Sequence, residues 1–193
     1  MMPESLRIIH EEHASLAAML RSLMLMVERG PEDSAEQFFD VVRAMLFYID
    51  EFPERLHHPK ESDLLFPKVL RADPSCMETV KRLEDDHLKG ESNVRELQHL
   101  LLAWELLGEL RRGAFTEYAR CYVDFYLDHM RIEETVILPS AQKHLTATDW
   151  KELDAAFAAN RDPLSGHVSD PVYDRLFTRI VMKAPAPIGV GSQ

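Results

Sequence analysis

Two well-separated stretches of this sequence share one pattern, which constrains the fold more than any other feature. His57 and Glu61 in the first stretch, and His129 and Glu133 in the second, are each four residues apart. On an α-helix this spacing places both side chains on one face, one turn apart. Two apolar residues and a proline then follow each glutamate at the same distance. The repeat predicts two helices that each direct an imidazole and a carboxylate toward one point, as a metal site requires.

A shorter pattern also occurs twice, before each of these stretches. Glu12 precedes His13, and Asp86 precedes His87. Each half of the chain therefore contains an acid–His pair, then His-x-x-x-Glu, then two apolar residues and a proline. An internal repeat of this kind indicates two similar structural halves.

Apolar residues recur at steps of three and four over long segments, which is typical of amphipathic helices. The predicted helices cover residues 4–28, 34–70, 76–112 and 116 to about 139, with Ser34 as an N-cap and Gly113 as a terminator. Only 7 glycines in 193 residues agree with a helical chain. Long helices with short connections predict an all-α fold, an antiparallel up-down four-helix bundle. We expect Pro53 or Pro59 to kink or break the second helix, so that the adjacent His57 and His58 can both reach one site.

The character of the sequence changes after residue 145. We expect residues 1–145 to form the bundle and residues 146–193 to form a C-terminal extension. Short helices are predicted at 148–159 and 171–182, followed by a loose tail rich in proline and glycine. No residue after 145 is expected to contribute to a functional site.

Each predicted helix carries a histidine on or beside its inward stripe, and two helices add a carboxylate. Burial of an isolated carboxylate costs on the order of several kcal/mol, and no basic residue shares these inward positions. Metal ions are therefore the expected partners. The ligands outnumber those of one tetrahedral zinc ion, which favours two metals bridged by carboxylates. The predicted ligands are His13, His57, His58, Glu61, His87, His129 and Glu133.

The series His13, His57-x-x-x-Glu61, His87 and His129-x-x-x-Glu133 resembles the hemerythrin-like, or HHE cation-binding, domain over about residues 5–145. The resemblance implies a bundle that holds two iron ions in a non-heme di-iron centre. It also implies reaction with dioxygen, nitric oxide or related small molecules. By this resemblance Glu61 and Glu133 bridge the ions, and the four histidines are terminal ligands. Imidazole and carboxylate ligands also suit zinc or manganese.

The sequence departs from the oxygen-carrying members of that family on the third helix. Those members resemble one another in having two histidines four residues apart there, whereas His87 follows Leu83 and precedes Glu91. The missing ligand could be His58, Glu91 or water. The acidic ligand of the fourth helix could be Glu133 or Glu134; we expect Glu133, because a spacing of four keeps it on the face of His129.

A ferritin-like di-iron bundle is the closest structural alternative, since it uses Glu-x-x-His pairs. Glu54 precedes His57 at that spacing, and Glu84 precedes His87. The fourth helix, however, has Tyr126 where the pattern requires an acid.

Charge and cysteine content bound the remaining functions. A net charge of −11 argues against nucleic acid or an anionic membrane as a partner, and no apolar run approaches a membrane span. The 2 cysteines form no CxxC motif, which is typical of reduced thiols in a cytoplasmic protein. We expect a protein that binds or senses dioxygen, nitric oxide or iron, with an unknown protein partner. A di-iron enzyme acting on peroxide or nitric oxide and a metal-free interaction module are the alternatives.

Overall fold

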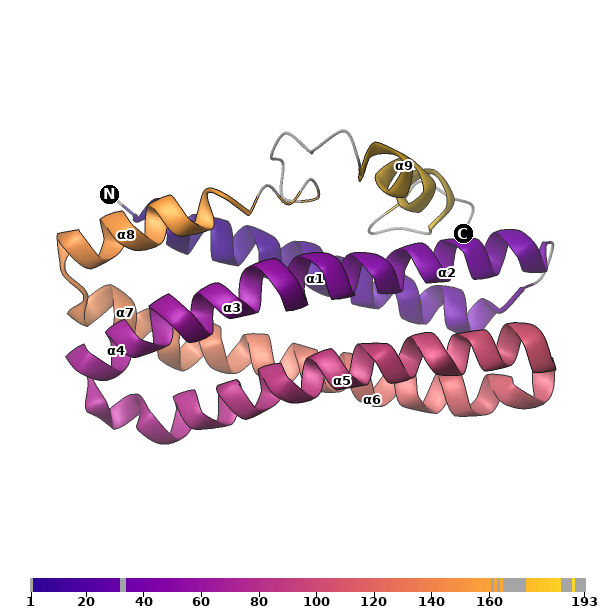
Figure 1. The fold of residues 1–193 in the computed structure, drawn as a ribbon, viewed down its shortest axis with the longest axis horizontal. Helices are drawn as coiled ribbons and strands as arrows, with labels where there is room; N and C mark the ends of the chain where they lie inside the picture. The colour runs from indigo at the N-terminus through magenta and orange to yellow at the C-terminus, as the bar shows by residue number, and fades with distance from the viewer. Residues whose placement is uncertain are drawn as a thin grey trace.

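The computed structural model describes residues 2–31, 34–160, 162, 164, 173–184 and 189, and these residues contain helices and no strand. Four long helical stretches run side by side (Figure 1). The first is α1 (Glu4–Arg29) and the third is α5 (Met77–Leu107). The second runs without a break through α2 (Ala35–Ile49), η1 (Asp50–His57), α3 (His58–Lys60), η2 (Glu61–Leu65) and α4 (Phe66–Ala72). The fourth runs through α6 (Arg112–Ile132), η5 (Glu133–Ile137) and α7 (Leu138–His144).

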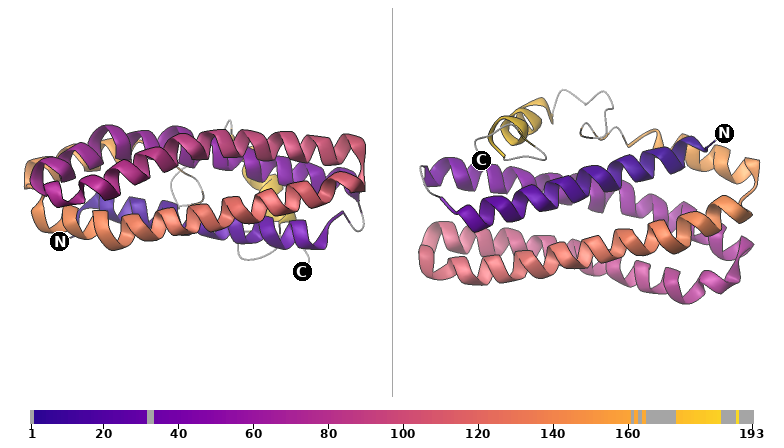
Figure 2. Two further views of the ribbon diagram at one scale, coloured as in Figure 1. Left: turned by 90° about the horizontal axis from the view of Figure 1, so that it is seen from below. Right: turned by 180° about the vertical axis from the view of Figure 1, so that it is seen from behind.

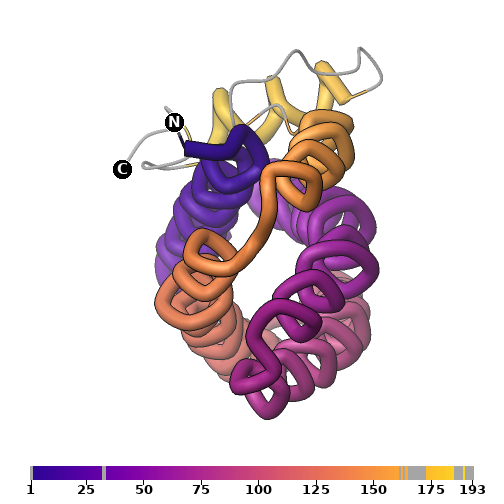
Figure 3. The backbone as a smooth tube through the Cα atoms, turned by 90° about the vertical axis from the view of Figure 1, so that its left-hand side faces the viewer, coloured from indigo at the N-terminus to yellow at the C-terminus, as the bar shows by residue number. Residues whose placement is uncertain are grey.

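Each stretch packs against its neighbours in sequence, and the fourth closes on the first. The contacts join α1 with α2, α2 with α5, α5 with α6, and α6 with α1. The end-on view in Figure 3 shows the resulting ring of helices, and Figure 2 shows them lengthwise from two other sides. The predicted all-α, antiparallel bundle is confirmed.

Glycines in the left-handed region end two of these stretches. Gly30 follows α1 with φ 78°, and Gly108 follows α5 with φ 87°. The prediction that Gly113 ends the third helix is wrong, because the chain already turns at Gly108 and at the 3₁₀ turn η4 (Glu109–Arg111). Gly113 lies inside α6 instead. Ser34 caps α2 as predicted, accepting a hydrogen bond from the Gln37 amide at 3.3 Å.

The segments η1, η2 and η5 are π-helical turns, and each ends two residues before a proline. The Phe66 amide donates to the Glu61 carbonyl, and the Leu138 amide donates to the Glu133 carbonyl, five residues back in both cases. A proline ring clashes with the carbonyl four residues earlier in an α-helix. The wider turn relieves that clash at Pro67 and Pro139 without ending the helix.

A π turn accommodates Pro59 in the same way, because the His58 amide donates to the Pro53 carbonyl five residues back. The helix is not broken near Pro53 or Pro59, since it continues through both as a π turn, and the alternative of a kink stays a prediction. The backbone before His58 departs from a regular α-helix, as expected. His57 and His58 are adjacent in sequence, yet both are buried at 5% exposure.

The core consists of two apolar clusters with a polar layer between them. One cluster lies toward the C-terminal end of α1 and includes Trp104 and Phe115. The other lies toward the N-terminal end of α1 and includes Phe66 and Leu83. All seven predicted metal ligands fall between these two clusters along the helices.

The extension packs on the bundle. Helix α8 (Ala147–Phe157) lies against α1, and α9 (Asp174–Lys183) lies against α2. Thr146 caps α8, two residues before the predicted start at 148, through a capping box with Asp149. The predicted boundary at residue 145 stays a prediction, and most of the predicted tail lies outside the described residues. No helix within the described part of the chain is both long and apolar enough to cross a bilayer.

Candidate metal centre

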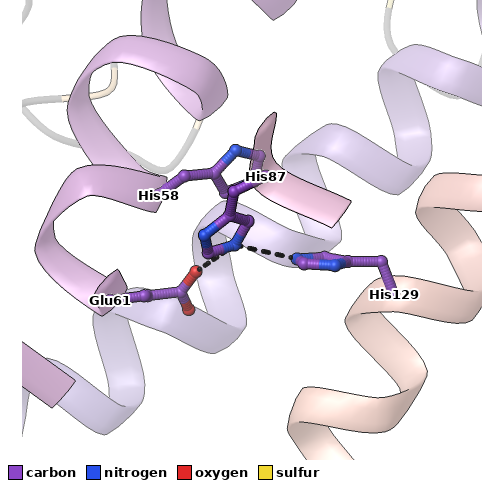
Figure 4. Close-up of side chains that lie close together, drawn as sticks. All are labelled: His58, Glu61, His87 and His129. Atoms are coloured by element: carbon purple, nitrogen blue, oxygen red, sulfur yellow. Dashed lines mark hydrogen bonds and ion pairs between the residues drawn. The ribbon is translucent and has the colours of Figure 1, made fainter. Parts of the chain in front are cut away.

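The structure brings all seven predicted ligands together in the polar layer. His13 comes from α1, and His87 comes from α5. The second stretch supplies His57, His58 and Glu61, and the fourth supplies the rest. The most buried of the seven are Glu61 at 0% exposure and His129 and Glu133 at 1%. Figure 4 shows His58 and Glu61, from the second stretch, converging with His87 and His129 from two other helices.

Four donor atoms surround a first position. His57 Nε2 lies 3.1 Å from Glu61 Oε1, and His13 Nε2 lies 3.3 Å from Glu133 Oε2. The two Nε2 atoms are 3.2 Å apart. Donor atoms about 2.1 Å from a shared ion would be about 3.0–3.4 Å from one another, so this spacing fits one metal ion. We refer to these four donors as the His13/His57 position.

A second set of donors uses the other oxygens of the same glutamates. His87 Nε2 lies 3.5 Å from Glu61 Oε2, and His129 Nε2 lies 3.3 Å from Glu133 Oε1. The two Nε2 atoms are 3.2 Å apart. His58 also offers a ring nitrogen within 4.8 Å of the donors of Glu61, His87 and His129. These donors form the His87/His129 position.

Each glutamate therefore directs one oxygen to each position. All four oxygens of Glu61 and Glu133 are buried without a hydrogen-bond partner among the described residues. Buried charged oxygens in this state are costly unless a cation satisfies them. Two metal ions, each shared between the carboxylates, would satisfy all four, so the residues present fit a two-metal centre.

The electrostatics of the layer keep both carboxylates ionised. Burial alone would raise the pKa of Glu133, but the nearby imidazoles of His129, His13 and His87 bring that pKa well below its usual value. The pKa of Glu61 is also lowered, because His57 and His87 outweigh burial and the nearby Glu133. Both side chains are thus held in the form that binds cations.

His58 differs from its neighbours in charge. Burial, followed by the positive charges of His87 and His129, lowers the pKa of His58 well below its usual value. Its imidazole is therefore neutral, which is the form that coordinates a metal.

Outer hydrogen bonds fix the rings of four histidines through their Nδ1 atoms. His57 donates to Glu12 at 2.6 Å, His13 to Glu134 at 3.1 Å, and His58 to Glu54 at 3.1 Å, while His87 pairs with the Ser62 hydroxyl at 2.9 Å. With Nδ1 turned outward, the Nε2 lone pair of a neutral ring points inward. His129 is the exception, since its Nδ1 has no hydrogen bond among the described residues and lies 3.8 Å from Asp86.

The repeated acid–His pairs now have a structural explanation. Glu12 supports His57, and Asp86 faces His129. In both halves the acid therefore serves a histidine of a neighbouring helix, not the histidine beside it in sequence. The repeat revealed the pairs, but adjacency alone gave no indication of this cross-helix arrangement.

The structure distinguishes between the ligand alternatives that the sequence left open. Glu91 lies at the surface in an ion pair with Arg95, and Glu134 binds the outer face of His13. Of the proposed replacements for the missing histidine, His58 is the residue that joins the cluster. Glu54, the candidate acid of the ferritin-like pattern, binds His58 Nδ1 and accepts a hydrogen bond from Tyr126 instead of facing the donors.

Sequence reasoning missed one contribution from beyond residue 145. Asn160 donates from Nδ2 to Glu12 Oε2 at 2.9 Å, and so it touches the carboxylate that holds His57. The expectation of no contribution there is wrong. No local pattern could have revealed a contact between residues at opposite ends of the chain.

A small cavity borders the His13/His57 position. Its volume is about 10 Å³, close to the room that one water molecule needs. His13, His57 and His58 form one side of it, and its apolar walls include Leu16 and Met130. The space has room for about one water-sized molecule, and neither Glu61 nor Glu133 is among its lining residues.

Residues 4–141 match the family model described as the hemerythrin HHE cation binding domain. The match spans the four helical stretches of the bundle and includes all seven convergent residues. No curated protein matches the chain.

Proposed function

Since the chain belongs to the hemerythrin HHE cation binding domain family, we propose that it is a non-heme di-iron protein that binds or senses dioxygen or nitric oxide. The observation that carries this proposal is the pairing of four buried, unsatisfied carboxylate oxygens with two sets of imidazole nitrogens. Glu61 and Glu133 would bridge the two ions. In a metal-free module these oxygens would have only the imidazoles of the layer to offset the cost of their burial, with no hydrogen bond among the described residues.

In this function the protein's own residues would hold the ions, orient the ligating histidines and keep bulk water away from the site. A bound iron pair would supply electrons to a small ligand and take them back. Glu12, Glu134 and Glu54 hold their histidines with Nε2 turned inward. The apolar clusters on both sides of the polar layer exclude bulk water from it.

The size of the cavity favours a diatomic ligand. A space of about 10 Å³ lined by His13, His57 and His58 has room for about one water-sized molecule, which suits a ligand as small as dioxygen or nitric oxide. Binding or sensing therefore fits the described residues better than chemistry on a larger molecule.

The test is a spectral titration of the ferrous-loaded protein with nitric oxide and, separately, with dioxygen. We expect new absorption bands with each gas, at a stoichiometry tied to the iron content. Leu56→Phe, which narrows the cavity, should keep the iron but slow the spectral change. Leu64→Phe is the matched control, because Leu64 is also half-buried in the second stretch but does not line the cavity. An iron-loaded protein whose spectrum responds to neither gas contradicts the proposal.

One observation favours an enzyme acting on peroxide as a second candidate. The Tyr126 ring is stacked 5.7 Å from His58, and its hydroxyl donates to Glu54. A buried phenol at this distance can deliver an electron and a proton to the centre. Steady turnover of hydrogen peroxide by the iron-loaded protein, reduced in Tyr126→Phe but not in Tyr118→Phe, would support this candidate over simple binding.

A further inference from the structure

We infer that Asn160 is a positioning residue for the His13/His57 position, and that the C-terminal extension thereby makes the two metal positions unequal. This inference rests on the proposed two-metal centre. It assigns a role to a segment that follows the family match at residues 4–141.

A chain of three contacts connects Asn160 to that position. Lys60 Nζ donates to Asn160 Oδ1, and Asn160 Nδ2 donates to Glu12 Oε2 at 2.9 Å. The same Glu12 oxygen accepts from His57 Nδ1 at 2.6 Å. Because Lys60 occupies the amide oxygen, the amide nitrogen of Asn160 is directed at Glu12. The side chain is 4% exposed, so water does not compete for these bonds.

Glu12 needs this support. It is a buried carboxylate at 7% exposure, and its Oε1 has no hydrogen-bond partner among the described residues. Without Asn160, His57 would be the one described side chain that donates to it. A carboxylate held on one side can rotate, and the orientation of the His57 ring depends on it.

The extension is fixed before the chain reaches Asn160. Asp154 of α8 accepts hydrogen bonds from both the amide and the hydroxyl of Ser5, each at 2.7 Å. Phe157 is fully buried, and its ring centre lies 5.8 Å from that of His57. Phe157, three residues before Asn160, therefore holds Asn160 in place by packing, whereas Asp154 anchors an earlier turn of α8.

The His87/His129 position has outer partners of its own, and Asn160 contacts none of them. Glu54, which accepts a hydrogen bond from Tyr126, pairs with His58 Nδ1. His87 pairs with a neutral hydroxyl, that of Ser62, and His129 Nδ1 lies 3.8 Å from the nearest carboxylate oxygen of Asp86. A carboxylate partner raises the basicity of a ligating imidazole, whereas a hydroxyl does so less. The support from Asn160 thus reaches one position and leaves the other unchanged.

The test compares Asn160→Ala with Asp154→Ala and the wild-type chain. Each protein is loaded with two equivalents of ferrous iron without oxygen, and iron is then withdrawn by a graded series of chelators. We expect Asn160→Ala to release one equivalent at an affinity about tenfold weaker than wild type, and the other as wild type. Asp154→Ala removes an anchor of α8 without touching Glu12, so it should lower the unfolding temperature but release both equivalents as wild type.

Three results would overturn the inference. In the first, Asn160→Ala releases both iron equivalents with wild-type affinity. In the second, it weakens the binding of both equivalents equally. In the third, Asp154→Ala weakens the same equivalent as much as Asn160→Ala does, which would show that loosened packing causes the effect. All three results presuppose a wild-type chain that retains two irons, so none of them can be confused with failure of the proposed function. A wild-type chain that does not retain two irons contradicts the proposed function and this inference with it.

Discussion

Glu61 and Glu133 are the most deeply buried carboxylates of the candidate metal centre. Each is within 1% of complete burial, and neither has a hydrogen bond to either oxygen among the described residues. The groups that offset the cost of burying these oxygens are imidazole nitrogens, which lie 3.1 to 3.5 Å from them. Each carboxylate therefore contributes one oxygen to each position.

Removal of either bridging carboxylate should therefore empty both positions. We predict that Glu61→Ala and Glu133→Ala each retain less than one iron per chain after loading and desalting, as measured by elemental analysis. Glu91→Ala is the control, since Glu91 has the same spacing from its histidine but pairs with Arg95 at the surface. Retention of one full equivalent by either variant would show that the carboxylates do not bridge.

Gly90 makes room for the Tyr126–Glu54 contact. A Cβ at this position would overlap the Tyr126 hydroxyl oxygen and lie 2.8 Å from Glu54 Oε1. We predict that Gly90→Ala destabilises the metal-free protein by about 1–3 kcal/mol, measured by urea unfolding, because the buried groups must shift. Adding Tyr126→Phe, which removes the hydroxyl, should recover part of that loss. If Gly90→Ala has wild-type stability, this close packing is wrong.

At the residue scale, the spacing of four explains why the sequence could place the ligands. A helix fixes which face His57, Glu61, His129 and Glu133 share, so local pattern was sufficient to group them. Asn160 was not predictable in this way. Its contact with Glu12 depends on how α8 folds back along α1, and no periodicity encodes that return.

At the scale of elements, the π turns connect the sequence repeat with the site. Glu61 and Glu133 are each the first residue of such a turn, and each turn leads to an apolar residue followed by proline. The repeated prolines were read from the sequence as points of disruption. Their actual effect is to widen the helix by one residue, so that it continues through the prolines into α4 and α7.

The ends of the second and fourth stretches are joined through Asp73. Hydrogen bonds from Ser75 and Ser140 lower the pKa of Asp73 to about 2, from an ordinary value of 3.8. A lowered carboxyl pKa contributes stability that is present above about pH 4 and lost as the pH falls through about 2. We predict that Asp73→Asn lowers the unfolding temperature at neutral pH, and that its difference from wild type shrinks below pH 4.

Circular dichroism melts from pH 6 to pH 2 would measure this dependence. Asp63→Asn is a suitable control, because Asp63 is exposed in η2. A difference between Asp73→Asn and wild type that stays constant over the whole range would contradict the assignment.

At the scale of the whole molecule, the extension shares the core of the bundle. Leu153 and Phe157 of α8 are fully buried in the apolar cluster that contains Phe66 and Leu83. The apolar stripes of the sequence predicted the four-stretch bundle, since each stripe must face a common interior. The apolar stripes did not reveal that α8 covers α1, because the short apolar stripe of α8 could pack on many surfaces equally well.

Truncation of the buried ring in α8 should therefore destabilise the whole chain. We predict that Phe157→Ala costs about 3–5 kcal/mol and that unfolding remains a single transition by both circular dichroism and fluorescence. Met182→Ala in α9 is the control, since Met182 is 56% exposed. A loss below about 1 kcal/mol, or an early separate transition, would show that α8 is not part of the core.

The most direct test of the account as a whole is the number of iron ions bound per wild-type chain. Anaerobic ferrous loading, removal of free metal and elemental analysis against protein concentration give this number. The two sets of donors that share Glu61 and Glu133 predict two ions per chain. A chain that stays folded and retains one ion or none would contradict the two-metal centre on which the proposed function depends.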